Sequence, residues 1–287
     1  MSRVHPTAIV DPSAELADDV QIGAYSVVGP HVSIGNGTVL MNHVTVSQRT
    51  RIGERNRLHT GCVVGGDPQD RKYEGEPTAC RIGDDNEIRE HTTIHRGTGN
   101  GVGETIIGSG NLLMVGSHVA HDCHIGDRTV IANQVMLAGH VAVEDGASIG
   151  GGVGIHHFAT IGRFSFVGGL ARISRDVPPF MIVEGHPAEV RAVNVIGMLR
   201  NGFEQADVDA MKEVHRCLFR HGGAAAAELP MLRDRFASLD AVQHLCAAVE
   251  ASAAGMHGRA RESSRSDDKW VASRKGSGTD PGPHALT

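Results

Sequence analysis

The chain has 287 residues, enough for one large repeat domain and a smaller second domain. Its net charge of −6 argues against a nucleic-acid partner, because phosphate backbones are bound through an excess of Lys and Arg. The five cysteines form no C-x-x-C pair, and the opening MSRVHPTAIV lacks the apolar stretch of a signal peptide. We therefore expect a soluble cytoplasmic protein without a disulfide framework or a transmembrane segment.

An aliphatic residue recurs at every sixth position, in runs from Val4 to Val64, from Ile82 to Ile94 and from Ile107 to Ile173. A helical face repeats every three or four residues and an ordinary strand every two, so this period predicts a short strand plus a turn as the unit. Three units would close one triangular coil, so residues 18 apart should stack at the spacing of neighbouring strands, about 4.8 Å. The pattern predicts an all-β hexapeptide solenoid over residues 1–187.

Two polar, Gly-rich segments interrupt the repeat, at about 65–81 and 96–106. We expect them to leave the solenoid as loops, and loops on a rigid scaffold often carry function. The run Asp176-Val177-Pro178-Pro179 should end the coils, because proline donates no ladder hydrogen bond.

Residues 188–256 are predicted to form a small α-helical domain after the solenoid, with helices at about 189–200, 207–220, 224–236 and 240–253. From 257 to 287 the chain is rich in Ser, Arg and Gly with almost no aliphatic residues. This composition predicts a disordered tail.

Histidines cluster in the middle coils, although any one of them could be a plain surface or turn residue. The 18-residue stacking rule places Gly139 beside His121, and His140 beside Asp122. A histidine with an adjoining carboxylate can act as a general base, and a glycine lets a substrate oxygen approach a backbone N–H. These parts suit acyl transfer to a hydroxyl or an amine. The cluster comprises His91, His95, His118, His121, His124, His140, His156 and His157.

A metal site is the competing interpretation, because His118, His121, Cys123 and His124 fall within seven residues. Alternation along a strand would point some of them to opposite faces, which favours a metal-free site. The glycines of GTGNGVG and IGGGVG do not fit a phosphate-binding loop, and no serine stands in a nucleophile elbow. We predict neither a cofactor nor a covalent intermediate.

Several longer segments are more specific than hexapeptides: DPQDRKYEGEPT, IREHTTIHRGT, NLLMVGSHVAHDCHIGD, LAGHVAVED and RDVPPFMIVEGHPA. With VHPTAIVDPSA and IGAYSVVGPHV, they resemble the UDP-N-acetylglucosamine O-acyltransferases, in order, from about residue 4 to 203. The resemblance implies a left-handed parallel β-helix and a homotrimer with active sites between subunits. It also implies transfer of a 3-hydroxyacyl group from acyl carrier protein to the sugar 3-hydroxyl, the first step of lipid A biosynthesis.

The resemblance assigns roles to named residues. His121 looks like the general base, Asp122 its orienting partner, and the Gly139 N–H the oxyanion donor. Further residues resemble substrate contacts: Gln69, Asp70 and Lys72 in the first interruption, His95, His118 and His140 in the coils, and Asn194 and Arg200 near the nucleotide.

Three positions depart from the family pattern and put the nucleotide or sugar preference in doubt. His157 replaces a usual glutamine, which makes it a further candidate contact, while Ile196 replaces an acidic residue and Asn201 an arginine. Gly169 aligns with the position that limits acyl-chain length, so glycine there predicts a long chain unless it is simply a coil glycine. For the acidic carrier, the candidate docking residues are Arg191, Arg200, Arg216 and Arg220.

Two other functions stay open at this point. A related solenoid transferase could acylate the 2-amino group, or the 3-amino group of an amino-sugar analogue. A non-catalytic solenoid could bind only the UDP-sugar or the carrier. The retained group of His121, Asp122 and Gly139 argues against the second.

Overall fold

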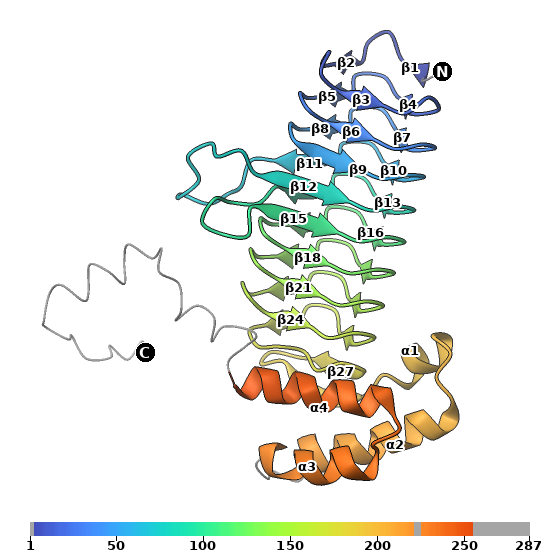
Figure 1. Ribbon diagram of the computed structural model, residues 1–287, viewed down its shortest axis with the longest axis vertical. Helices are drawn as coiled ribbons and strands as arrows, with labels where there is room; N and C mark the ends of the chain where they lie inside the picture. Colours follow the sequence, from blue (N-terminus) through green and yellow to red (C-terminus); the bar gives the residue numbers. More distant parts are fainter. Residues whose placement is uncertain (1–2, 221–224, 255–287) are drawn as a thin grey trace, which may run out of the picture.

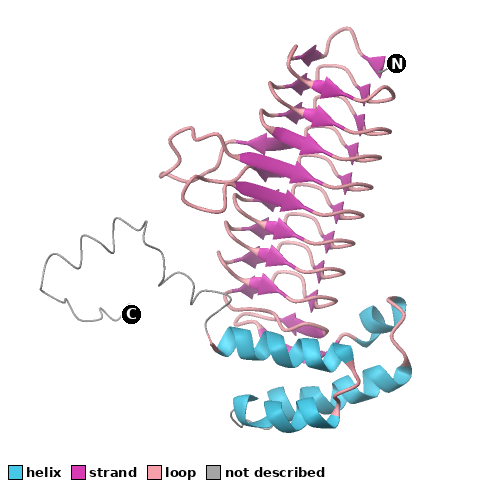
Figure 2. Cartoon of the chain, viewed as in Figure 1, coloured by secondary structure: helices cyan, strands magenta, loops and turns pink. Residues whose placement is uncertain are grey.

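The computed structural model describes residues 3–220 and 225–254 of the chain. Short strands stack into a long column, and helices pack against its C-terminal end (Figures 1 and 2).

The strands take up the three runs of the repeat in turn. The first run forms β1 (Arg3–Val4), β2 (Ile9–Val10), β3 (Glu15–Leu16), β4 (Gln21–Ile22), β5 (Val27–Val28), β6 (Ser33–Ile34), β7 (Val39–Leu40), β8 (Thr45–Val46), β9 (Thr50–Ile52), β10 (Arg57–Leu58) and β11 (Val63–Gly66). The second forms β12 (Ala79–Ile82), β13 (Glu87–Ile88) and β14 (Thr93–His95). The third forms β15 (Glu104–Ile107), β16 (Leu112–Leu113), β17 (His118–Val119), β18 (His124–Ile125), β19 (Val130–Ile131), β20 (Met136–Leu137), β21 (Ala142–Val143), β22 (Ser148–Ile149), β23 (Gly154–Ile155), β24 (Thr160–Ile161), β25 (Phe166–Val167) and β26 (Arg172–Ile173).

Every third strand joins the same parallel sheet, so the column has three flat sides. Within the uninterrupted runs the paired residues are 18 apart: His118 pairs with Met136, which pairs with Gly154. The predicted stacking rule is therefore confirmed. At the two interruptions the pairing spans more residues, as between Leu58 and Ile88, because the extra chain leaves the column as a loop.

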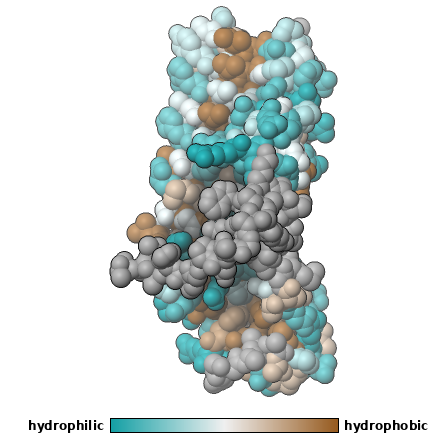
Figure 3. All heavy atoms as spheres, turned by 90° about the vertical axis from the view of Figure 1, so that its left-hand side faces the viewer, coloured by the Kyte–Doolittle hydropathy of each residue, from teal (hydrophilic) through white to brown (hydrophobic). Residues whose placement is uncertain are grey.

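The repeated aliphatic residues fill the inside of the column. From Ile22 to Ile173 each of them is at most 3% exposed, and burial of one such side chain contributes about 1.5–3 kcal/mol. At the open N-terminal end, Val4 is 40% and Ile9 66% exposed. Hydrophobic atoms are visible at that end of the column in Figure 3. Stability thus comes from stacking each coil between two others.

The corners of the coils are tight turns, many of which hold a residue in the left-handed region. Asp122 (φ 58°) and His140 (φ 62°) occupy two such corners in successive coils. The His140 N–H donates to the carbonyl of His121 at 3.0 Å, so the corner of one coil is tied to the corner before it. Asp122 and His140 are held near each other in this way.

Two loops project from the same side of the column (Figure 1). The first runs over 67–78, between β11 and β12, and the second over 96–103, between β14 and β15. They are hydrogen-bonded at their bases, where Gly97 N–H donates to the Ala79 carbonyl at 3.0 Å and Ala79 N–H to the Gly103 carbonyl at 2.9 Å.

The column ends in β27 (Met181–Glu184), which pairs antiparallel with β28 (Glu189–Val193). The predicted helix at 189–200 is therefore wrong for its first half. The free edge of β27 offers backbone partners there, and the side chains of β28 alternate in exposure as on a strand. The helix begins only at Val195, after Asn194 caps it.

The helices are α1 (Val195–Arg200), α2 (Gln205–His215), α3 (Ala225–Arg235) and α4 (Asp240–Ala253), and Arg216–Arg220 continues α2 as a π-helical turn. They share a second core that includes Met198, Met211, Leu232 and Leu245, and Phe180 joins it to the column. In the described part of the chain no helix has the length and apolar character to cross a bilayer. The tail predicted at 257–287 lies outside the described residues.

Candidate active site

His121 and Asp122 form a hydrogen-bonded pair at one corner of the column. The Nδ1 atom of His121 lies 2.8 Å from Oδ2 of Asp122. The Asp122 side chain is 0% exposed, whereas that of His121 is 13% exposed. A buried carboxylate thus holds an imidazole that solvent can reach.

The second loop encloses the Asp122 carboxylate with donors. Oδ1 accepts hydrogen bonds from the N–H groups of Thr98 at 3.1 Å, Val102 at 3.0 Å and Gly103 at 3.2 Å, and Oδ2 accepts one from Oγ1 of Thr98 at 2.7 Å. Burial alone would raise the pKa of Asp122, but the hydrogen bonds from His121 and Thr98 outweigh it and hold the pKa below its usual value. The carboxylate is therefore ionised at neutral pH.

The ionised carboxylate fixes the proton on one side of the His121 ring. Because the carboxylate only accepts, Nδ1 carries the proton and donates it, which leaves the lone pair on Nε2. The ring of His140 stands edge-on to His121, with centroids 5.1 Å apart, and stacks on Phe158 at 4.5 Å. His121 is thereby held in the protonation and orientation of a general base.

Gly139 lies directly against this base. A Cβ atom at this position would stand 2.5 Å from Cε1 of His121 and 2.7 Å from its Nε2, so only glycine fits beside the ring. Within the described residues the Gly139 N–H has no hydrogen-bond acceptor. It is free to donate to an oxygen that reacts next to His121.

The pair opens onto a cavity of about 1010 Å³ between one side of the column and the first loop. Eight of the predicted site residues line it: Gln69, Asp70, Lys72, His118, His121, Gly139, His140 and His157. Their convergence supports the assignments made from the sequence, which stay predictions as to role.

Other residues of the cavity were missed, among them Arg71, Ala120, Met136, Gly154 and Arg172, whereas His156, which also lines it, was named only as a member of the histidine cluster. Met136, Gly154 and Arg172 follow His118 at successive intervals of 18 on the same sheet. The stacking rule could therefore have found them. Met136 is 55% exposed, and with the partly exposed Ala138 it gives the cavity an apolar side.

The predicted contact His95 does not line the cavity, and its ring stands edge-on to that of His118, with centroids 4.8 Å apart. Burial, and then the neighbouring His118, lowers the pKa of His95 to about 4. Burial also lowers the pKa of His118, whose Nδ1 is 2.7 Å from Oγ1 of Thr93. Both rings are neutral at pH 7, so they offer hydrogen bonds rather than charge.

The remaining predicted residues do not line this cavity. Asn194 caps α1, accepting from the Gly197 N–H at 3.0 Å and donating to the Phe164 carbonyl at 2.9 Å. Arg200 ends that helix, and Ile196 within it is 64% exposed. Asn201 donates to the Gly197 carbonyl at 2.8 Å. Gly169 lies exposed at a coil corner, where an added Cβ atom would have the Gly151 carbonyl oxygen as its nearest neighbour at 3.4 Å.

The alternative metal set is not brought together. Cys123 is 1% exposed, its Sγ lies 3.2 Å from the Ala138 carbonyl, and burial raises its pKa to about 12. Among the described residues, the group with ligand atoms close enough for one ion is His121, Asp122 and His140, within 4.8 Å of one another. Both Asp122 oxygens already accept hydrogen bonds, so a metal-free site stays our prediction.

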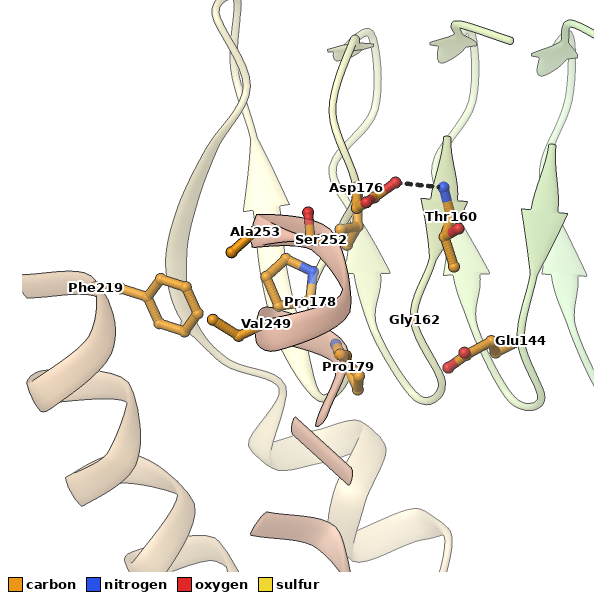
Figure 4. A pocket seen from close by; sticks show the side chains of 12 residues that line it. Glu144, Thr160, Gly162, Asp176, Pro178, Pro179, Phe219, Val249, Ser252 and Ala253 are labelled. Atoms are coloured by element: carbon orange, nitrogen blue, oxygen red, sulfur yellow. Dashed lines mark hydrogen bonds between the residues drawn. The ribbon is translucent and has the colours of Figure 1, made fainter. Parts of the chain in front are cut away.

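A second cavity, of about 280 Å³, lies where α4 packs on the column (Figure 4). Pro178, Pro179, Phe219 and Val249 make much of its wall apolar, and none of the predicted site residues lines it. One of its two carboxylates, Glu144, lies 3.2 Å from Nε2 of His244 on α4 and accepts from the Arg163 N–H at 2.8 Å. Burial alone would raise the pKa of Glu144, but the contacts with His244 and Arg163 outweigh it and hold the pKa below its usual value. The ionised group therefore links α4 to the column.

Known proteins resemble the chain over most of its length. A family model described as UDP N-acetylglucosamine O-acyltransferase, domain 2, matches residues 176–257, and one for bacterial transferase hexapeptides matches 104–139. The acyl-[acyl-carrier-protein]–UDP-N-acetylglucosamine O-acyltransferase of Syntrophobacter fumaroxidans is 45% identical over 221 residues, which are 77% of this chain and 86% of that protein.

Solved structures agree. LpxA from Acinetobacter baumannii superposes with a TM-score of 0.84 at 42% identity, covering 87% of this chain and 97% of that one. UDP-N-acetylglucosamine O-acyltransferase from Moraxella catarrhalis gives 0.82 at 42% identity, with the same coverage. The predicted fold class, a left-handed parallel β-helix followed by a small helical part, is confirmed.

Proposed function

The chain belongs to the UDP-N-acetylglucosamine O-acyltransferase family, and from this premise we propose that it moves a 3-hydroxyacyl group from acyl carrier protein to the 3-hydroxyl of UDP-N-acetylglucosamine, the first step of lipid A biosynthesis. The predicted enzyme class is confirmed by the relatives named above. The observation that carries the mechanism is the His121–Asp122 pair at 2.8 Å, with its imidazole on a large cavity and its carboxylate buried.

In the proposed reaction, Nε2 of His121 takes the proton from the sugar 3-hydroxyl as the oxygen attacks the thioester carbonyl. Asp122 stabilises the imidazolium that forms. The carbonyl oxygen becomes an oxyanion, which accepts the Gly139 N–H. The intermediate then collapses, the carbon–sulfur bond breaks, and His121 returns the proton to the leaving thiolate. No metal ion, cofactor or acyl-enzyme takes part.

The two substrates divide the cavity by chemistry. Gln69, Asp70 and Lys72 stand on the first loop and offer polar groups to the sugar and to the 3-hydroxyl of the acyl group. Met136 and the partly exposed Ala138 give an apolar side along the column, which suits a hydrocarbon chain. The open corner at Gly169 leaves that side unblocked, so we propose that the donor carries a long chain.

A homotrimer completes the nucleotide site in this proposal. Asn194 and Arg200 lie on or beside α1, away from the cavity lined by their own chain. A neighbouring subunit that brings α1 to the cavity would place the Arg200 guanidinium, which is suited to phosphate, beside the UDP group. His157, on the same cavity, then faces the sugar nucleotide in place of the usual glutamine.

Acyl carrier protein docks on the helical part in our proposal, because the carrier is acidic. Arg216 and Arg220 line a hollow of about 480 Å³ together with Lys212. Arg191 already pairs with Glu189 at 2.8 Å and is the weaker candidate. We also propose that the reaction takes place in the cytoplasm.

The direct test is transfer of a 3-hydroxyacyl group from its carrier to UDP-N-acetylglucosamine and, in parallel, to the 3-amino analogue, with the wild type and His121→Ala. We expect turnover with the hydroxyl acceptor and a loss of about 10³-fold or more in the variant. Preference for the amine would move the assignment to the amino-sugar transferases. Binding of UDP-sugar without turnover of either acceptor would identify a non-catalytic solenoid.

Mixed assemblies test the shared site. His121→Ala and Arg200→Ala chains, each inactive alone, are unfolded together and reassembled. If Arg200 serves the His121 of a neighbour, some interfaces in the mixture keep both residues and activity returns. Activity that stays at the level of the separate variants would contradict the shared site.

A further inference from the structure

Arg96, at the start of the second loop, is a buried cation with several partners on the first loop. It is 2% exposed. Its Nη1 donates to the Gly65 carbonyl at 2.9 Å, its Nη2 to the Tyr73 hydroxyl at 2.7 Å, and the same nitrogen pairs with the Asp67 carboxylate. The guanidinium carbon also lies 5.5 Å from the centre of the Tyr73 ring. Every side of this charge is therefore in contact with the first loop or its base.

The partners of Arg96 flank the part of the loop that faces the cavity. Asp67 stands just before residues 69–72 and Tyr73 just after them, and residues 69–72 all line the cavity. Between the two anchors the segment is folded on itself, because Oδ1 of Asp70 accepts from the Lys72 N–H at 3.0 Å and its carbonyl from the Tyr73 N–H at 3.1 Å. One side chain thus fixes both ends of a short, stiff substrate segment.

The same stretch of chain holds the base. Two residues beyond Arg96, Thr98 donates to the Asp122 carboxylate through both its N–H and its hydroxyl. Arg96 itself is fixed to the column, since its N–H donates to the Gly66 carbonyl at 3.0 Å. The substrate segment and the His121–Asp122 pair are therefore tied to adjacent points of one rigid strand end.

A buried guanidinium is costly unless it is fully paired, so its presence calls for a reason. Packing the two loops together would need only apolar side chains. Directional bonds to a carbonyl, a phenol and a carboxylate do more, because the planar fork fixes their relative angles. This choice suits a task that depends on position to within a fraction of an ångström.

We propose that Arg96 is a positioning residue for the transfer reaction: through Asp67 and Tyr73 it sets the distance between the substrate segment 69–72 and the His121–Asp122 pair. It touches neither substrate nor reacting atoms. The inference rests on the proposed function, because it names a determinant of the same site.

Three variants test it. Tyr73→Phe removes one hydroxyl and keeps the ring, Arg96→Lys keeps the charge and loses the fork, and Arg81→Met is the matched control. Arg81 is also an arginine close to the loops, but it is 50% exposed, pairs with Glu104 at 3.4 Å and does not line the cavity. Tyr73→Phe keeps the test open if Arg96→Lys fails to fold.

Two readouts separate positioning from simple stability. The first is the Michaelis constant for UDP-N-acetylglucosamine, which we expect to rise about tenfold in Tyr73→Phe while kcat changes less than about threefold. In Arg96→Lys we expect the Michaelis constant to rise and kcat to fall. The second is trypsin cleavage after Arg71 or Lys72 in the folded protein, which we expect to be about tenfold faster in both variants and unchanged in Arg81→Met.

The outcomes are distinct. A lower melting temperature with wild-type Michaelis constants and wild-type cleavage at 71–72 would overturn the inference and leave Arg96 a purely structural residue. Equal effects in Arg81→Met would overturn it as well. A wild-type protein that transfers no acyl group to either acceptor would instead refute the proposed function itself.

Discussion

Replacing Asp122 with asparagine tests the base in the most direct way, because it changes one charge and almost no volume. In the wild type, Oδ1 accepts three backbone N–H groups of the second loop, and Oδ2 accepts from His121 and from the Thr98 hydroxyl. An asparagine keeps the three backbone bonds only if its oxygen faces them. Its NH₂ group must then face Nδ1 of His121.

The consequence is a change of tautomer. Nδ1 of His121 has to accept from the asparagine, so the ring proton moves to Nε2, which faces the cavity and can no longer take a proton. Restoring the active tautomer sets a donor against a donor, which costs about 1–3 kcal/mol, and the imidazolium loses a charged partner worth about 2–3 kcal/mol. The sum, about 3–6 kcal/mol, predicts a fall in kcat of about 10²–10⁴-fold.

The assay is steady-state transfer from carrier to UDP-N-acetylglucosamine between pH 6 and pH 9. We expect the Michaelis constants to stay within a few-fold of wild type, because Asp122 does not line the cavity. Thr98→Val is the control: it removes one hydroxyl bond to the carboxylate and leaves the tautomer intact, so a loss below about tenfold is expected. An Asp122→Asn enzyme with more than a tenth of wild-type kcat would refute the assignment of Asp122 as the orienting group.

Three other changes have definite expected results. In Gly139→Ala the new methyl group displaces the His121 ring, so kcat should fall about 10²-fold with little change in melting temperature. Wild-type turnover would show that the methyl group fits beside the His121 ring without displacing it. Gly169→Met should shift the preferred donor to a shorter chain, measured by competition between acyl carriers, and an unchanged preference would remove Gly169 from the acyl site. The pKa of Glu144 is lowered in the folded chain, so its stabilising effect is present above its unfolded pKa of about 4.3 and is lost as pH falls through the lower folded value. Glu144→Gln should therefore flatten the acid side of the melting-temperature curve below about pH 4, and a slope equal to wild type would contradict the link to His244.

The solenoid could be predicted in detail because its determinant is local and repeated. Each of the aliphatic residues from Val4 to Ile173 that keep the six-residue period falls in one of the strands β1 to β26. The pattern failed where the repeat stopped. Residues 189–193 have the apolar spacing of a helix, yet the open edge of β27 recruits them as a strand, and no local pattern records that edge.

The site divides in the same way. The 18-residue stacking rule placed Gly139 and His140 beside His121 and Asp122. The same rule could have added Met136, Gly154 and Arg172 to the cavity. It could not find the donors that surround the Asp122 carboxylate or the contacts of Arg96. Those groups lie on loops of irregular length, and a loop breaks the constant interval that lets sequence spacing stand for distance.

The sequence by itself determined the period, the side of each strand that is buried, and the family to which the chain is similar, because these depend on residue type at regular intervals. Only the tertiary structure decided which oxygen of Asp122 faces which donor, that Gly139 has no room for a side chain, and that Asn194 and Arg200 lie away from the cavity of their own chain. The physical reason is range: burial and hydrogen bonding along a coil act between fixed neighbours, whereas the protonation of His121 depends on groups that two loops bring together from outside the repeat.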